Sequence, residues 1–154
     1  MKILMVCLGN ICRSPMAEGI LQQKLKEHNL NKSVYVDSCG FDRYHQGDPP
    51  FHMAIQTAKN HGINIENQRQ RLFTTNDFDD FDKIYIMDSN NYRLVKNMSR
   101  NDEDMKKVDY LLNLVHPNEN RHVPDPWGGT HKDYEHAFQL INTACDEIIR
   151  MLEK

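Results

Sequence analysis

Near the start of the chain, a short apolar stretch runs into a tight loop and then into an amphipathic segment. Lys2–Val6 has the composition of a buried strand, and the next nine residues are Cys7-Leu8-Gly9-Asn10-Ile11-Cys12-Arg13-Ser14-Pro15. Gly9 and Asn10 tolerate the positive φ angles that a tight loop requires. Ser14 is a favoured N-cap residue, and Pro15 fits the first position of a helix. A strand, a loop and a helix in this order predict a parallel α/β sheet.

The same alternation of strands and helices continues along the chain. Further strands are expected at Val34–Val36, which ends at Asp37-Ser38, at Lys83–Met87 and at Tyr110–Leu112. Helices are expected from about Pro15 to His28, from about Pro50 to Gly62, around Tyr92–Met98 and over Tyr134–Leu152. No repeat or linker divides the sequence, so residues 1–154 are expected to form a single domain. The pattern predicts a three-layer α/β fold with helices on both faces of a parallel sheet.

Three polar residues lie where predicted strands end. Cys7, Ser38 and Asp88 each follow or close an apolar run. Parallel sheets bind their ligands at the carboxyl ends of the strands, so these residues should share one rim.

The loop between the first strand and the first helix has the chemistry of an anion site. Backbone amides of a loop and a helix N-terminus that face one point suit a phosphate group. Arg13 adds a planar donor that binds two phosphate oxygens at once, and Cys7 is expected to be a thiolate in this positive field. The segment therefore predicts a cysteine-dependent phosphatase. The alternative is that Cys7 is an ordinary core residue and Arg13 a solvated side chain.

A phosphatase of this kind also needs an acid that protonates the leaving group, and the loop contains none. Asp125 is the best candidate, because prolines flank it on both sides within Val123–Gly129 and stiffen its placement. From the residues alone, an aspartate in an ordinary surface turn is the alternative.

The loop string Cys7–Pro15, together with Asp125-Pro126-Trp127, resembles the low-molecular-weight protein tyrosine phosphatases. The likeness extends over nearly the whole chain, including Asp37-Ser38 and Met87-Asp88. It implies a four-stranded sheet in the order 2-1-3-4. It also implies hydrolysis of phosphotyrosine, with Cys7 as nucleophile, Arg13 as phosphate ligand and Asp125 as acid and then base.

The resemblance assigns roles to further residues. It implies that the substrate is held by the loop residues Leu8, Gly9, Asn10, Ile11, Cys12 and Ser14. Asn10 holds the loop shape, the Ser14 hydroxyl stabilises the thiolate, and Ser38 matches a serine that lies behind the loop. Cys12 would trap oxidised Cys7 as a disulfide, although small-residue packing is the alternative role.

Two aromatic residues are expected to form the walls of the pocket. Tyr44 occupies a position where the family usually has tryptophan, and Trp127 one where many members have tyrosine. Two such walls suit a flat phosphorylated ring. Gly128 replaces the second tyrosine of some relatives, so phosphorylation of a tyrosine pair is not expected.

Three other functions remain as alternatives. A protein-arginine phosphatase of the same fold is favoured by Gly128-Gly129, whereas Ile11 favours tyrosine because the arginine branch carries threonine there. A thioredoxin-coupled arsenate reductase would need a resolving thiol, and no cysteine lies between Cys39 and Cys145. A phosphate-binding module without turnover would need neither the thiol nor the acid.

Composition limits the partners and the compartment. The net charge of −3 and the absence of a basic stripe argue against nucleic-acid binding. The apolar start is too short for a signal peptide or a membrane helix, so a cytoplasmic protein without a membrane partner is expected. The four cysteines have no zinc-site spacing, and no metal or cofactor is expected. The expected partners are tyrosine-phosphorylated proteins, with a cognate tyrosine kinase as a candidate.

Overall fold

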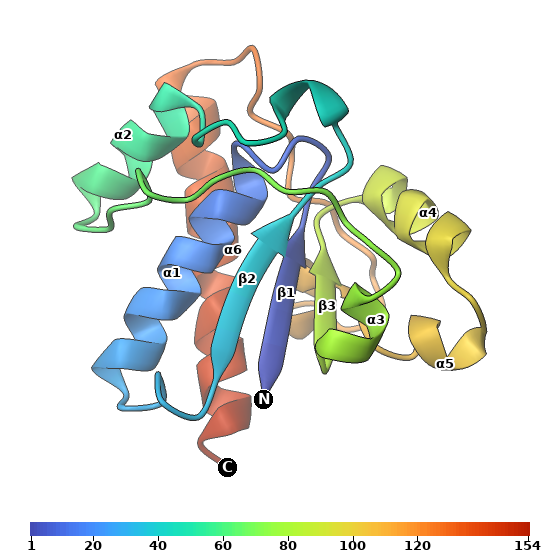
Figure 1. Cartoon of the computed structure of the whole chain (residues 1–154). Coiled ribbons are helices and arrows are strands. Elements are labelled where there is room, and N and C mark those ends of the chain that lie inside the picture. Colours follow the sequence, from blue (N-terminus) through green and yellow to red (C-terminus); the bar gives the residue numbers. More distant parts are fainter.

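A single parallel sheet organises the chain (Figure 1). The computed structural model describes all residues, Met1–Lys154. The strands are β1 (Lys2–Val6), β2 (Tyr35–Cys39), β3 (Lys83–Ile86) and β4 (Val108–Tyr110), in the order β2-β1-β3-β4. All three neighbouring pairs are parallel, which confirms the expected fold class and strand order.

The fourth strand differs from the prediction. It ends at Tyr110, where a strand over Tyr110–Leu112 was expected, because the next residues form a 3₁₀ turn over Leu111–Leu114. Leu111 and Leu112 in that turn are buried, so the apolar run reflects burial rather than extended backbone.

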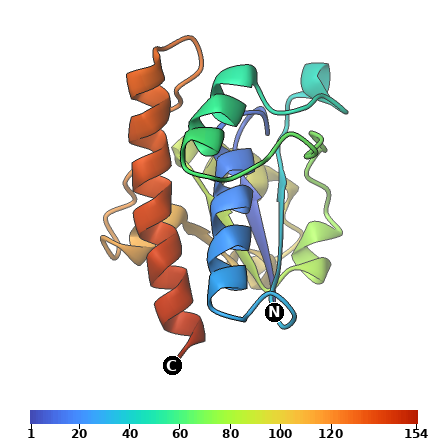
Figure 2. The ribbon, with the colours of Figure 1, turned by 90° about the vertical axis from the view of Figure 1, so that its left-hand side faces the viewer.

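Six α-helices cover the sheet: α1 (Arg13–Glu27), α2 (His52–Asn60), α3 (Asp77–Asp80), α4 (Ser89–Met98), α5 (Asp102–Met105) and α6 (His131–Leu152). Figure 2 shows α1, α2 and α6 together on one side of the sheet, and Figure 1 shows α3, α4 and α5 on the other. The result is the expected three-layer arrangement. The four-residue helices α3 and α5 were not predicted, because they are too short to show a periodic pattern.

Alternation along β1 divides the core in two. Ile3 and Met5 belong to the larger apolar cluster under α1 and α6, whereas Leu4 and Val6 belong to the smaller cluster under α3 and α4. All four side chains are at most 1% exposed. A strand covered on both faces has no polar side, which explains its continuous apolar sequence.

The start of α1 corrects one part of the sequence prediction. The first helical residue is Arg13, and Cys12 is the N-cap, so Ser14 and Pro15 lie inside the first turn. Ser14 is therefore not the cap, and its hydroxyl is free for contacts described below. In the loop, Asn10 has the expected positive φ of 54°, whereas Gly9 does not.

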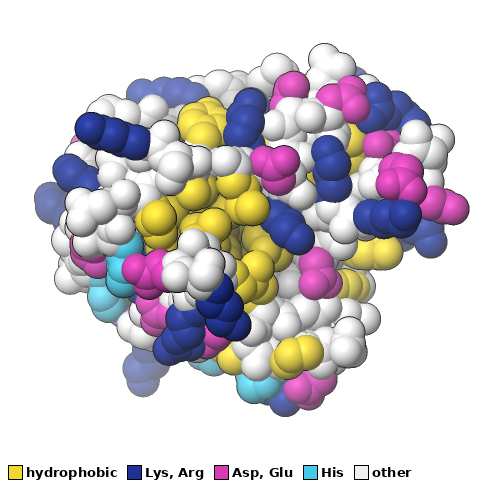
Figure 3. All heavy atoms as spheres, turned by 90° about the horizontal axis from the view of Figure 1, so that it is seen from below, with side chains coloured by type: hydrophobic (Ala, Val, Ile, Leu, Met, Phe, Trp, Pro, Cys, Tyr) yellow, Lys and Arg dark blue, Asp and Glu magenta, His cyan; other side chains and the backbone are white.

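The face opposite to the loop rim carries a group of apolar side chains near both termini (Figure 3). Met1 and Met151 are about half exposed there and line a small pocket with Tyr85. None of the helices combines the length and the apolar composition that crossing a bilayer requires.

Gly40, just after β2, lies in close contact with the loop. A Cβ atom at this position would lie 2.7 Å from the Leu8 carbonyl oxygen and 2.9 Å from the Asn10 nitrogen. Its other side is fixed, since its N–H donates to Arg71 O and its carbonyl accepts from Phe73 N. A side chain here would have to displace loop backbone.

Substituting Gly40→Ala should therefore damage the loop. We expect a loss of stability of about 1–3 kcal/mol and a fall in activity of at least tenfold, because the displaced backbone carries the site. Gly62→Ala is the matched control, since Gly62 has a φ of +78° and no heavy atom within 4 Å of the added Cβ. It should lose stability but keep activity. Equal activity in the two variants, measured with thermal melting in parallel, would contradict the prediction.

Candidate active site

The loop after β1 folds around the sulfur of Cys7, which is 3% exposed. The backbone N–H groups of Asn10 and Ser14 donate to Sγ at 3.3 and 3.5 Å. The Ser14 hydroxyl lies 3.1 Å from the same atom. The sulfur also lies beside the N-terminus of α1, where the helix dipole favours negative charge. Donors that converge in this way stabilise an anionic sulfur.

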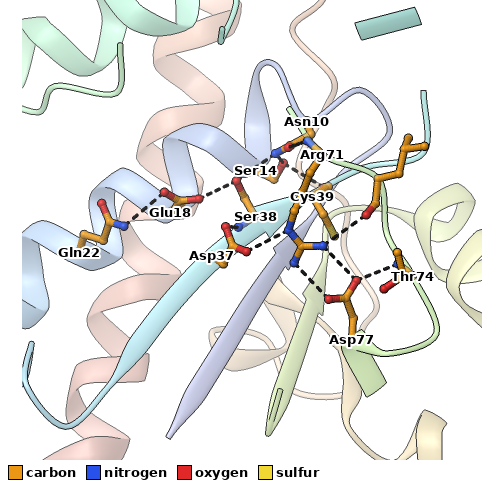
Figure 4. A network of polar contacts seen from close by, with 11 residues as sticks. Asn10, Ser14, Glu18, Gln22, Asp37, Ser38, Cys39, Arg71, Thr74 and Asp77 are labelled. Carbon is orange, nitrogen blue, oxygen red and sulfur yellow. Dashed lines mark hydrogen bonds and ion pairs between the residues drawn. The ribbon is translucent and has the colours of Figure 1, made fainter. Parts of the chain in front are cut away.

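Asn10 holds the loop together from the inside. Its Nδ2 donates to Ser14 Oγ at 2.8 Å and to Ser38 Oγ at 2.9 Å, and its Oδ1 accepts from the backbone N–H of Arg71 at 3.1 Å. All of its side-chain groups are thus used, and its left-handed backbone is kept in place. These contacts tie the loop to β2 and to the segment before α3 (Figure 4).

Behind Ser38 lies a buried acid. The Ser38 hydroxyl donates to Glu18 Oε1 at 2.8 Å, and Gln22 Nε2 donates to Oε2 at 3.2 Å. Burial raises the pKa of Glu18 from 4.5 to about 7, and the neighbouring Asp37 acts in the same direction. The Ser38 and Gln22 hydrogen bonds offset only part of this effect.

Arg13 is the buried cation of the site, with its side chain 2% exposed. Its Nη1 donates to Asp88 Oδ2 and to the Val123 carbonyl oxygen, both at 2.8 Å. Burial alone would lower the pKa of Arg13, but the nearby Cys7 and Asp88 raise it overall. The guanidinium stays charged, and Nη1 is committed to the protein. Nε and Nη2 are left for a bound anion.

The predicted acid reaches the same place from the far end of the chain. Asp125 Oδ2 lies 3.7 Å from Arg13 Nη2, and its Oδ1 accepts from the Trp127 N–H at 3.1 Å. The carboxyl side chain is 46% exposed, in contrast to Asp88 at 19%. The structure therefore brings Cys7, Arg13 and Asp125 together.

These groups surround a pocket of about 170 Å³. Its lining consists of Cys7, Leu8, Gly9, Ile11, Cys12, Arg13, Asp42, His45, Asp125 and Trp127. The Trp127 ring packs edge-on against Phe51, with centroids 4.7 Å apart, and lies 6.2 Å from His45. One wall is therefore aromatic, as the sequence predicted.

The other predicted wall is different. Tyr44 is 94% exposed and does not line the pocket, whereas its neighbour His45 does. Arg43–His45 form a 3₁₀ turn that Asp42 caps, and the turn directs Tyr44 outward. His45 lies between two carboxylates, 3.5 Å from Asp42 and 3.3 Å from Asp48.

Cys12 lies at the pocket wall but in a different environment from Cys7. It is 4% exposed, and its Sγ lies 3.4 Å from the hydroxyl of Tyr134 on α6. Burial raises the pKa of the Cys12 thiol to about 12, so it is neutral near pH 7. The two thiols of the loop are therefore not equivalent.

Sequence reasoning missed several residues of this site. Glu18 follows Ser14 by one helical turn on a buried stretch, which is the signal that could have identified it. Asp42 and His45 carry no pattern of their own, because their position depends on the turn. Val123 contributes only its carbonyl oxygen, which no side-chain pattern can reveal.

Known proteins are similar to this chain in both sequence and fold. A family model described as low molecular weight phosphotyrosine protein phosphatase matches residues 2–154. A putative low molecular weight protein-tyrosine-phosphatase of Synechocystis is 36% identical, over 100% of this chain and 98% of the relative. The human low molecular weight phosphotyrosine protein phosphatase is 33% identical, over 94% and 90% of the two chains. The crystal structure of a protein tyrosine phosphatase from Entamoeba histolytica superposes with a TM-score of 0.92 at 31% identity, covering 99% and 97%.

The buried carboxyl group of Glu18 makes stability depend on pH. Between pH 4.5 and 7 the unfolded chain ionises this group while the folded state keeps its proton, so stability falls as the pH rises through this window and stays lower above it. Glu18→Gln should remove the effect, giving a variant more stable than wild type by on the order of 2–3 kcal/mol at pH 8 and little different at pH 4.5. Denaturant unfolding at both pH values measures this. Glu27→Gln, on the exposed end of the same helix, should show no such difference; a gain for Glu18→Gln that is equal at both pH values would contradict the assignment.

Proposed function

The chain belongs to the low molecular weight phosphotyrosine protein phosphatase family, and on this premise we propose that it hydrolyses phosphotyrosine in proteins through a cysteinyl-phosphate intermediate. One observation carries the proposal: a buried sulfur with converging N–H donors shares its pocket with a buried guanidinium and an exposed carboxyl group. These are the nucleophile, the phosphate ligand and the proton donor that phosphoryl transfer needs.

In the first step, the Cys7 thiolate attacks phosphorus in line with the ester oxygen. The S–P bond forms as the P–O bond to the ring breaks, and protonated Asp125 gives its proton to the departing oxygen. Arg13 Nε and Nη2, together with the loop amides, bind the equatorial oxygens, whose charge grows in the transition state. Asp88 and Val123 hold the guanidinium in the orientation that this requires.

In the second step, water attacks the cysteinyl phosphate. Asp125, now a carboxylate, takes a proton from the water while the S–P bond breaks and phosphate leaves. Cys7 departs as a thiolate, and the Ser14 hydroxyl and two backbone amides are in position to stabilise it. The exposure of Asp125 supports this second role, because water can reach it.

The pocket walls support tyrosine as the substrate. Trp127 and Ile11 present apolar surface to a flat ring, and stacking on an aromatic wall favours phosphotyrosine. A phosphoarginine guanidinium would meet Ile11, which has no hydrogen-bond acceptor. Gly128 and Gly129 favour the arginine alternative, so phosphotyrosine and phosphoarginine are the two substrates that a test must separate.

The position and the pKa of Cys12 support a role for this residue in protecting Cys7 against oxidation. Cys12 lies in the same loop as Cys7 and lines the same pocket, and its raised pKa keeps the thiol neutral and therefore less prone to direct oxidation. A sulfenic acid on Cys7 would condense with the Cys12 thiol, forming an S–S bond and releasing water.

The substrate test compares phosphotyrosine, phosphoarginine and phosphoserine peptides of one sequence, with EDTA present. We expect at least tenfold higher kcat/KM for phosphotyrosine than for phosphoarginine, because unsatisfied donors against Ile11 cost about 1–3 kcal/mol. Phosphoserine should be poorest, since its short side chain does not reach the thiolate. Ile11→Thr should narrow the tyrosine-to-arginine gap. A wild-type preference for phosphoarginine would instead assign specificity to the Gly128-Gly129 loop.

The proposed role of Asp125 as an acid is tested with substrates whose leaving groups differ in basicity. Asp125→Asn should lower turnover of phosphotyrosine by about 10²–10⁴-fold, and much less for an aryl phosphate whose leaving group is already acidic. Cys7→Ser is the control for the nucleophile and should abolish turnover of both while still binding vanadate. If Asp125→Asn slows the two substrates equally, Asp125 has a structural role instead.

The redox test exposes the protein to mild peroxide. Activity should disappear and return with added thiol, and mass spectrometry of the oxidised protein should find Cys7 joined to Cys12. Cys12→Ser should be active but poorly recoverable after oxidation. Full recovery of Cys12→Ser, or Cys7 joined to another cysteine, would remove this role from Cys12.

A further inference from the structure

A chain of hydrogen bonds runs from the Cys7 sulfur to the buried carboxyl group of Glu18. It passes through the Ser14 hydroxyl, the Asn10 amide and the Ser38 hydroxyl. Figure 4 shows the part of this chain from Ser14 to Glu18. We infer that Glu18 is a positioning residue: it supplies the terminal acceptor that fixes the direction of these bonds and thereby turns the Ser14 hydroxyl toward the sulfur. The inference rests on the proposed role of Cys7 as nucleophile.

The direction of the chain follows from the Asn10 amide. Its Oδ1 accepts from the Arg71 backbone N–H, which fixes the amide orientation, so both N–H groups of Nδ2 point to the two serine hydroxyls. Each hydroxyl oxygen therefore receives a hydrogen bond and has one proton of its own to donate. For Ser14, the sulfur at 3.1 Å is a closer acceptor than the carbonyl oxygen of Cys39 at 3.4 Å.

Ser38 depends on Glu18 in the same way. Its hydroxyl is buried, and the acceptor of its proton is Glu18 Oε1 at 2.8 Å. Without that acceptor the Ser38 O–H would have no hydrogen-bond partner, or the hydroxyl would rotate until its proton pointed toward the Asn10 N–H. Either outcome disturbs the amide and, through its second N–H, the Ser14 hydroxyl. Removing Glu18 should therefore change the hydrogen bonding of the Cys7 sulfur, although Glu18 does not contact Cys7.

The acceptor is present whether or not Glu18 carries a proton. A carboxylate accepts at Oε1, and so does the carbonyl oxygen of the neutral acid with its proton on Oε2. Gln22, which faces Oε2, is exposed and its amide can turn to meet either form. The titratable groups that face Glu18 from β2 are Asp37 and Tyr35. A glutamine at position 18 also offers a carbonyl oxygen, and a leucine offers none.

The experiment compares Glu18→Leu with Glu18→Gln and measures Cys7 directly. Alkylation of Cys7 by iodoacetamide at pH 6, followed by mass spectrometry, reports the thiolate without any turnover. We expect Glu18→Leu to react about tenfold more slowly at pH 6, with a smaller deficit at higher pH, and to lose about tenfold in kcat/KM for phosphotyrosine. Glu18→Gln should restore both to within about twofold of wild type.

Glu27→Leu is the matched control, because Glu27 lies on the same helix and accepts a hydrogen bond from Gln23 as Glu18 does from Gln22. It should alter neither readout. In a Ser38→Ala background, Glu18→Leu should add less than about twofold, since the effect passes through the Ser38 hydroxyl. Glu18→Met takes the place of Glu18→Leu if circular dichroism shows that the leucine variant does not fold.

Two results would overturn the inference: unchanged Cys7 alkylation in a folded Glu18→Leu protein, or equal impairment of Glu18→Gln and Glu18→Leu. The proposed function fails separately. A wild type that turns over no phosphotyrosine, yet shows the expected order of alkylation rates, would refute the phosphatase proposal and leave the positioning role intact.

Discussion

The site depends on the burial of one guanidinium group. Arg13 is almost completely removed from water, and a buried cation is stable only when anions and hydrogen-bond acceptors surround it. Its neighbours come from three separate segments: Cys7 from the loop after β1, Asp88 from the end of β3, and Val123 and Asp125 from the loop before α6. Removing one partner of a buried ion pair typically costs about 3–5 kcal/mol, so the cation binds these segments together.

The parallel sheet makes this convergence possible. Because β1, β2 and β3 run in the same direction, Cys7, Ser38 and Asp88 all lie at the carboxyl ends of these strands. Both faces of the sheet are occupied by apolar clusters. The polar network is confined to this end of the sheet, where the loop backbone supplies the hydrogen-bond donors. At the opposite end, the small pocket that Met1 and Met151 line is mostly apolar, and apolar side chains gather on that face (Figure 3).

The sequence predicted the parts that depend on neighbouring residues. Three local features were predicted at the right place in the chain, although not in every detail. They are the succession of strand, loop and first helix, the positive φ of Asn10, and the position of Cys7 and Arg13 in one pocket. The strand order came only through family resemblance. The flanking prolines made Asp125 a candidate acid, but only the resemblance favoured it over an ordinary surface turn, because nothing local relates Asp125 to a loop more than a hundred residues away. His45 was missed in favour of Tyr44, one residue earlier, because a 3₁₀ turn determines which of them faces inward. Glu18 was missed because its environment is created by packing between α1 and β2.

The two carboxylates near Arg13 differ in how firmly the protein holds them. Asp88 is 19% exposed and bonded to Nη1 at 2.8 Å, and it also caps α4 through the Asn91 N–H, so its oxygens are committed. Asp125 is 46% exposed and 3.7 Å from Nη2, a separation at which the guanidinium attracts it without holding it. The loose contact leaves Asp125 Oδ2 at the pocket without a hydrogen bond to the protein, where the proposed mechanism needs an acid.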